Sequence, residues 1–216
     1  MEKLRRQIID SRANGRKETK KTKVFIEIMA QQNGEIWITK FPYSKYLSDL
    51  SSPFRENAKR FIDAITSAGA TVTITNTYRP PERIYLMHWS WMIFKRKCQP
   101  ADVPPMTGVD ITWNSGNVGT DIAAATQMAV AFGIASLAVA PALNATSRHL
   151  TKSAIDMNIS WAGNLTIKSQ AGQEVTISSA PRTGMNKDLQ AVGRSYGVIK
   201  FHGGDKDRPH WSIDGW

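Results

Sequence analysis

A strictly alternating stretch, SAIDMNISW at residues 153–161, constrains the fold more than any other part of the chain. Successive side chains of a β-strand point to opposite faces, so this alternation predicts a strand with one buried face. The apolar face carries Ile155, Met157, Ile159 and Trp161. Asp156 is therefore expected on the face opposite the core.

A second short strand is predicted at residues 209–213. His210 and Ser212 share one face of this strand, whereas Trp211 and Ile213 share the other. The arrangement is the same as around Asp156, with polar side chains on one face and apolar side chains on the other. We therefore expect the two polar faces to meet in one cleft.

The remaining patterns predict helices and further strands. A surface helix is expected from Ser52-Pro53 to Gly69, and residues 82–97 are apolar nearly all round, as in a buried helix. Two more helices are expected after the capping residues Thr120 and Asn186. Strands are predicted at residues 71–77, 165–168, 174–178 and 198–201. Together these elements indicate an α+β fold, an antiparallel sheet flanked by helices.

The N-terminal part is expected to be an addition to the main domain. Residues 24–29 and 35–40 are rich in β-forming side chains and are joined across Gln32-Asn33-Gly34, which predicts a β-hairpin. We therefore expect residues 1–46 to be a basic extension with a hairpin, and residues 47–216 to be one domain.

The charge of the chain favours a polyanionic partner. The net charge is +10 at pH 7, and five basic residues gather near the start: Arg16, Lys17, Lys20, Lys21 and Lys23. Nucleic acid and an anionic bacterial envelope both fit such charge. A nucleic-acid-binding protein would need stacking aromatics among its basic residues, yet most tryptophans here fall in apolar patterns. Nucleic acid is therefore not expected as a partner. Charge alone leaves both an anionic envelope and a merely solvated basic arm open, and the protein is expected to be a monomer.

No membrane anchor is predicted. Residues 1–23 lack the apolar stretch of a signal peptide, and the longest apolar runs, residues 84–94 and 128–143, are too short or too interrupted to span a bilayer. The single cysteine, Cys98, excludes an internal disulfide. These features fit synthesis in the cytoplasm.

Histidine and carboxylate side chains are the metal ligands that the sequence offers. Cys98 alone cannot make a cysteine-based zinc site. His149 lies seven residues before Asp156, and His210 lies three residues after Asp207. Two histidines and one aspartate, with water in the fourth position, would make an open tetrahedral zinc site. A second carboxylate beside it could take the proton of that water.

Two motifs resemble those of a known enzyme family. SRHLTKSAID, residues 147–156, resembles the S-x-H-x-x-G-x-A-x-D signature of zinc peptidases that include the D-alanyl-D-alanine carboxypeptidases and the phage L-alanoyl-D-glutamate endopeptidases. These peptidases share a fold with the hedgehog signalling domain. DRPHW, residues 207–211, resembles their second motif, an acidic residue followed three positions later by histidine. Lys152 departs from the signature, which usually has glycine there.

The resemblance implies roles for individual residues. It implies Zn²⁺ on His149, Asp156 and His210, with Asp207 as general base and general acid. TYRPPE, residues 77–82, resembles the family's turn whose arginine positions substrate, which implies that role for Arg79. Ser147 is a further candidate for substrate contact.

The resemblance also implies a function. We expect a zinc-dependent peptidoglycan peptidase of the phage endolysin type, which cuts stem peptides. Such a protein would be made in the host cytoplasm and would reach the wall after release toward the periplasm. One alternative is a D-alanyl-D-alanine carboxypeptidase or dipeptidase on the same scaffold. Another alternative is a binding domain that keeps zinc but has no activity. The presence of Asp207 argues against this alternative.

Overall fold

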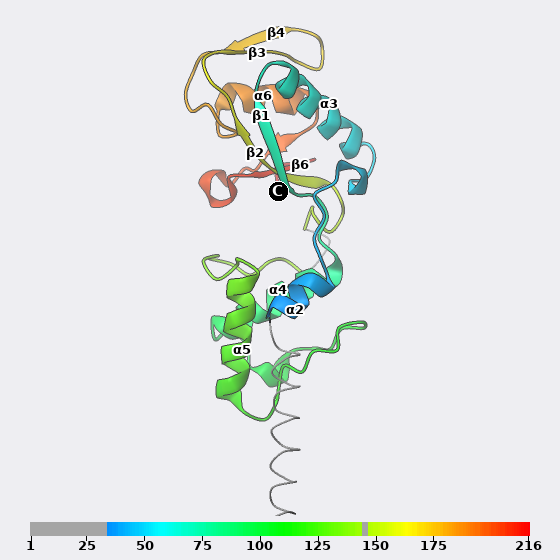
Figure 1. The fold of residues 1–216 in the computed structure, drawn as a ribbon, viewed down its shortest axis with the longest axis vertical. Helices are drawn as coiled ribbons and strands as arrows, with labels where there is room; N and C mark the ends of the chain where they lie inside the picture. Colours follow the sequence, from blue (N-terminus) through cyan, green and yellow to red (C-terminus); the bar gives the residue numbers. More distant parts are fainter. Residues whose placement is uncertain (1–33, 144–146) are drawn as a thin grey trace, which may run out of the picture. The chain divides into compact units, whose positions relative to one another are not determined.

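The computed structural model describes residues 34–143 and 147–216 (Figure 1). These residues divide into two compact units. The first takes the described residues up to Phe41 together with Tyr85–Ala140, and the second takes Pro42–Ile84 together with Pro141–Trp216. Tyr85–Ala140 thus groups with the described residues before Pro42, and the boundary expected at residue 46 stays a prediction. The predicted strand at residues 24–29 lies outside the described residues.

The second unit is built on an antiparallel sheet. Its strand order is β1-β2-β6-β5, and a separate hairpin joins β3 to β4. The α+β class with an antiparallel sheet, expected from the sequence, is confirmed. The bounds of the strands are β1 Thr71–Asn76, β2 Ala154–Ser160, β3 Leu165–Lys168, β4 Glu174–Ile177, β5 Ile199–Lys200 and β6 His210–Ser212.

Helices α3 (Phe54–Ser67) and α6 (Lys187–Ser195) pack on the core face of this sheet. Phe61 of α3 lies against Trp211 of β6, with ring centroids 5.5 Å apart. Ile155 joins the same buried cluster. Because side chains alternate along a strand, Asp156 and His210 point to the other face. The predicted separation of an apolar and a polar face is confirmed for these residues, but Ile213, which was expected on the apolar face, is 42% exposed and lies beyond the end of β6.

The first unit is helical in its described part, with α2 (Gly34–Lys40), α5 (Val118–Ala131) and most of α4 (Pro81–Phe94). The predicted strand at residues 35–40 is wrong, since these residues form α2. In a helix, positions four apart lie on one face, and Trp37 and Phe41 stack in this way with ring centroids 6.2 Å apart. The buried Trp37 ring thus stabilises a helix where residue propensities favour a strand.

Asparagine side chains cap two of the described helices, α5 and α6. Asn186 caps α6 as predicted, because its side chain accepts hydrogen bonds from the backbone N–H groups of Asp188 and Leu189. Asn117, not Thr120, caps α5, and the Thr120 N–H is the donor to the Asn117 side chain. Within the described residues, no helix is both long enough and apolar enough to cross a membrane.

Gly193 of α6 lies where the helix approaches the sheet most closely. A methyl group at this position would lie 2.9 Å from both the Trp211 ring and the Val198 carbonyl oxygen. We predict that Gly193→Ala lowers the free energy of unfolding by about 2 kcal/mol, despite the higher helix propensity of alanine. Denaturant titration measures this. Arg194→Ala, at the exposed next position, should change stability by less than about 0.5 kcal/mol, and equal stability of both variants would contradict the packing.

Candidate metal centre

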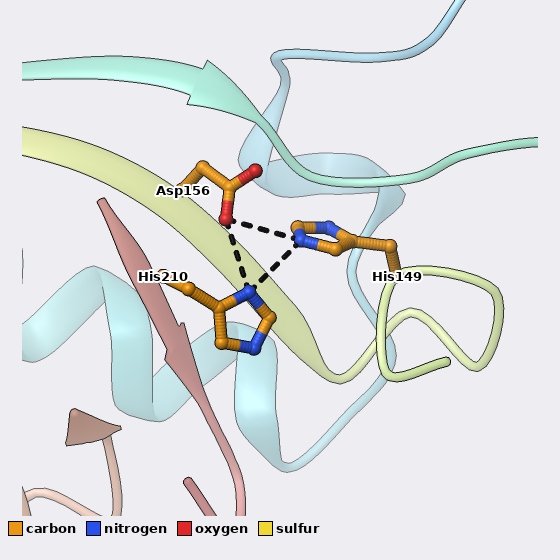
Figure 2. Close-up of side chains that lie close together, drawn as sticks. All are labelled: His149, Asp156 and His210. Carbon is orange, nitrogen blue, oxygen red and sulfur yellow. Dashed lines mark hydrogen bonds and ion pairs between the residues drawn. The ribbon is translucent and has the colours of Figure 1, made fainter. Parts of the chain in front are cut away.

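Three buried side chains of the second unit converge on one point, as Figure 2 shows. His149 Nε2 lies 3.1 Å from Asp156 Oδ1 and 3.2 Å from His210 Nδ1, and His210 Nδ1 lies 3.1 Å from Asp156 Oδ1. The three atoms therefore form a nearly equilateral triangle. His149, Asp156 and His210 are the group in the described residues that could hold a metal ion.

The sheet register places two of the three ligands. Asp156 of β2 and His210 of β6 are direct partners in the antiparallel ladder, and the Met157 N–H donates to the Pro209 carbonyl beside them. Because hydrogen-bonded and non-hydrogen-bonded pairs alternate along the ladder, this bond makes Asp156 and His210 a non-hydrogen-bonded pair. The side chains of such pairs lie closest together. Register alone therefore brings a carboxylate and an imidazole together.

A tight turn before β2 supplies the third ligand. The backbone N–H groups of Leu150 and Thr151 both donate to the Ser147 carbonyl, and the Ser153 N–H donates to the Arg148 carbonyl. These bonds fold residues 147–153 back on themselves, so His149 reaches the side chain of Asp156. The ligands are thus held by backbone hydrogen bonds.

Backbone carbonyls fix the tautomers of both histidines. His149 Nδ1 lies 2.8 Å from the Thr77 carbonyl oxygen, and His210 Nε2 lies 3.2 Å from the Trp216 carbonyl oxygen. A carbonyl only accepts, so each of these nitrogens carries the proton. Burial lowers the pKa of His149, which favours the neutral ring. In the neutral form of each ring, the nitrogen that faces the triangle presents a lone pair.

Asp156 is held ionised by its neighbours. Its Oδ2 accepts hydrogen bonds from Asn76 Nδ2 at 3.2 Å and from Arg79 Nη2 at 3.0 Å. Burial opposes ionisation, but the contacts with His149 and His210 and the charge of Arg79 outweigh it, so the pKa of Asp156 is well below its ordinary value. Oδ1 is left to face the triangle as an anionic donor.

This arrangement fits a divalent cation. Two ring nitrogens and a carboxylate oxygen face one another at 3.1–3.2 Å, so either a proton on a ring or a cation must lie among them. Tetrahedral zinc, with ligands about 2.0–2.1 Å away, spaces its ligand atoms about 3.3 Å apart, close to the observed triangle. The same donors also form the three-ligand set of non-haem iron. The donor set therefore indicates a metal site without choosing the ion.

Asp207 lies beside the ligands at the end of the 3₁₀ turn η3 (Gly204–Asp207). Its Oδ2 is 4.0 Å from His210 Nδ1, and its side chain is 47% exposed. Burial, and then the negative charge of Asp156, raise the pKa of Asp207. The ammonium of Lys200 donates to the Asp207 and His210 carbonyls at 3.1 and 2.9 Å and so ties η3 to β6. Asp207 is therefore a half-buried carboxylate next to the metal ligands.

The two residues expected to contact substrate are placed differently. Arg79 is in the site, but in this structure its guanidinium pairs with Asp156. Ser147 is half-buried at the start of the turn that carries His149. Among the described residues, we find no hydrogen bond between the Ser147 side chain and the three ligands.

The sequence did not indicate the groups that support the ligands. The carbonyls of Thr77 and Trp216 leave no mark in a sequence, because every residue has a carbonyl. Asn76 had a detectable signal, since it precedes Tyr78-Arg79 at the end of a predicted strand. In the ladder Asn76 is paired with Asp156, which places its amide on that carboxylate.

Lys152 occupies the position where the resembled signature has glycine. Its φ is 59°, in the left-handed region that favours glycine. The Lys152 carbonyl accepts from the Ser51 N–H, and its ammonium lies 4.7 Å from the centre of the Tyr78 ring. These contacts offset the cost of the backbone conformation.

Comparison with known proteins found no matching family model, no matching curated protein and no matching solved structure. The family resemblance therefore depends on the sequence motifs alone.

Substitutions of Lys152 test the turn. We predict that Lys152→Gly changes the free energy of unfolding by less than about 1 kcal/mol, because relief of strain offsets the lost ammonium–ring contact. Lys152→Val should destabilise by about 1–2 kcal/mol, since a β-branched side chain strongly disfavours positive φ. Equal stability of the two variants would argue against the left-handed conformation.

Metal binding should stabilise the fold. At a Zn²⁺ concentration 100 times the dissociation constant, we predict a gain of about 2.7 kcal/mol in the free energy of unfolding, measured by calorimetry after dialysis against a chelator. His149→Ala should abolish the gain. The control His88→Ala, a histidine of the first unit, should keep it. A gain that survives in His149→Ala would place the metal elsewhere.

Proposed function

We propose that the protein is a zinc-dependent peptidoglycan peptidase that hydrolyses an amide bond in cell-wall stem peptides, of the phage endolysin type. The observation that carries the proposal is the position of Asp207, a half-buried carboxylate 4.0 Å from His210 beside a buried His-Asp-His group. A site that only stored a metal would not need this second carboxylate. The motif resemblance at residues 147–156 and 207–211 supports the same activity.

The residues of the chain divide the chemistry among them. His149, Asp156 and His210 would hold Zn²⁺, which when bound polarises the amide carbonyl and makes water more acidic. Asp207 accepts the proton of the attacking water and then donates it to the departing amine. Its pKa is raised, which is the direction that suits a group that both accepts and donates a proton.

Arg79 would serve two purposes. One Nη2 contact orients Asp156. Because a guanidinium carries five N–H donors in a planar fork, the others remain able to bind the substrate carbonyl or a carboxylate. Its side chain is 27% exposed, so it can be reached from the solvent side of the site. Ser147 is proposed as a weaker substrate contact at the edge of the turn.

The charge of the chain supports the proposed partner. A net charge of +10 favours an anionic bacterial envelope over a neutral surface. We propose that the protein is made in the host cytoplasm and acts on the wall after release, as an endolysin does. The alternative of a D-alanyl-D-alanine carboxypeptidase or dipeptidase differs in its product. Free D-alanine released from intact stem peptides would favour that alternative.

Substitution of Asp207 tests the mechanism. We predict that Asp207→Asn retains zinc at one ion per chain but loses at least about 100-fold in the rate of peptidoglycan digestion, because the amide cannot carry the proton. The measurements are metal analysis and the release of new amino groups from purified peptidoglycan.

Asp205→Asn is the matched control. Asp205 lies two residues before Asp207 in the same turn, and its side chain is 83% exposed and paired with Arg208. This variant should digest peptidoglycan at close to the wild-type rate. Full activity of Asp207→Asn would refute the assigned proton transfer, and digestion by metal-free wild type would refute the zinc mechanism.

A further inference from the structure

One ion pair joins two segments that support different histidines of the candidate metal centre. The first segment is the turn at residues 147–153, which carries His149. The second is residues 213–216, directly after β6, whose Trp216 carbonyl oxygen lies 3.2 Å from His210 Nε2. Arg148 of the turn is paired with Asp214 of the second segment. The pair therefore links the turn that presents one histidine to the segment that orients the other.

The geometry of this pair is restrictive. Arg148 Nε lies 3.1 Å from Asp214 Oδ1 and 3.0 Å from Oδ2, and Arg148 Nη2 also donates to Oδ2. A guanidinium that donates from two nitrogens to one carboxylate fixes its orientation as well as its distance. The side chains of Arg148 and Asp214 are 29% and 37% exposed, so the pair adds only modestly to the stability of the fold. Its main effect is to fix the two segments relative to each other.

The Asp214 carboxylate also shapes its own segment. Its Oδ1 accepts from the Trp216 N–H at 3.2 Å and lies 3.3 Å from the Ser212 hydroxyl, which in turn accepts from the Gly215 N–H at 2.8 Å. Gly215 has a φ of 81°, which lets the chain turn tightly here. The carboxylate that Arg148 holds therefore determines where the backbone of Trp216 lies, and with it the acceptor for His210.

Other contacts hold residues 213–216, but they do not start beside a ligand. The His202 N–H donates to the Gly215 carbonyl at 2.9 Å, and His202 Nε2 lies 2.9 Å from the Asp214 carbonyl oxygen. The Ile213 N–H donates to the Ser153 carbonyl at 3.0 Å. Arg148, by contrast, directly precedes His149 in the chain. Its ion pair thus couples the position of His149 to the carbonyl behind His210.

We propose that Arg148 and Asp214 are positioning residues of the metal centre, and that their ion pair keeps His149 and His210 at the spacing that the ion requires. Loss of groups that orient ligand histidines typically weakens metal binding about 10- to 100-fold. The inference rests on the zinc site of the proposed function, but it does not depend on the peptidase activity.

The test is the zinc dissociation constant of the full chain, measured by competition with a chromophoric chelator. Arg148→Gln removes the guanidinium, and Asp214→Asn removes the charge while keeping Oδ1 as an acceptor. We expect each variant to bind zinc about tenfold more weakly than wild type. Arg148→Lys, which keeps the charge without the planar fork, should recover part of the loss.

A double variant and a control make the test specific to the pair. Arg148→Gln combined with Asp214→Asn should bind zinc no more weakly than either single variant, because two residues that act through one contact are not additive. The control is Arg182→Gln. Arg182 is an exposed arginine of the same unit whose Nε donates to the Gly163 carbonyl at 2.7 Å, and this variant should keep the wild-type dissociation constant.

Urea unfolding of the metal-free variants separates positioning from a structural role. The unfolding midpoints should stay close to that of wild type, because the pair is partly exposed. Unchanged zinc affinity in both single variants, or losses that add in the double variant, would overturn the inference. A lowered midpoint that Arg148→Lys restores without restoring zinc affinity would make the pair structural and would also overturn it.

The proposed function can fail separately. The predicted losses of zinc affinity in a protein that does not digest peptidoglycan would refute the peptidase and uphold the positioning role. Wild type that binds no zinc would refute both.

Discussion

The second unit holds two ring nitrogens and a carboxylate oxygen at contact distance from one another. His149 Nε2, Asp156 Oδ1 and His210 Nδ1 are 3.1–3.2 Å apart, and the outer nitrogens of both rings are committed to carbonyl acceptors. Three electronegative atoms so close together need a proton or a cation among them. The protein therefore uses part of the stability of its fold to keep together a group of side chains that could hold a metal ion.

That stability comes from the opposite face of the same strands. Asp156 alternates with Ile155 and Met157, and His210 is followed by Trp211, which is fully buried against Phe61. Each ligand on a strand is thus adjacent to a core residue. A shift of register by one residue would move the ligands and the core to the wrong faces together, so packing of the helices on the sheet also fixes the geometry of the site.

Alternation was sufficient to predict the strand of Asp156, the strand of His210 and their shared polar face, because period two is a property of the local chain. It was not sufficient at residues 35–40, where the contact of Trp37 with Phe41 favours a helix over β propensity. Nor could local periodicity show that Tyr85–Ala140 joins the described residues before Pro42, since a pattern reveals a buried face but not which core buries it. The role of the Thr77 and Trp216 carbonyls could not be predicted either, because it depends on where the backbone lies and not on the side chain.

The most direct test of the metal centre is X-ray absorption spectroscopy at the zinc edge on protein loaded with one equivalent of Zn²⁺. The account predicts four nitrogen or oxygen neighbours at about 2.0–2.1 Å, with the outer-shell scattering of two imidazole rings and no sulfur. A spectrum with one imidazole or none, or with six oxygen neighbours as for hydrated surface zinc, would contradict the assignment of His149, Asp156 and His210 as the ligands.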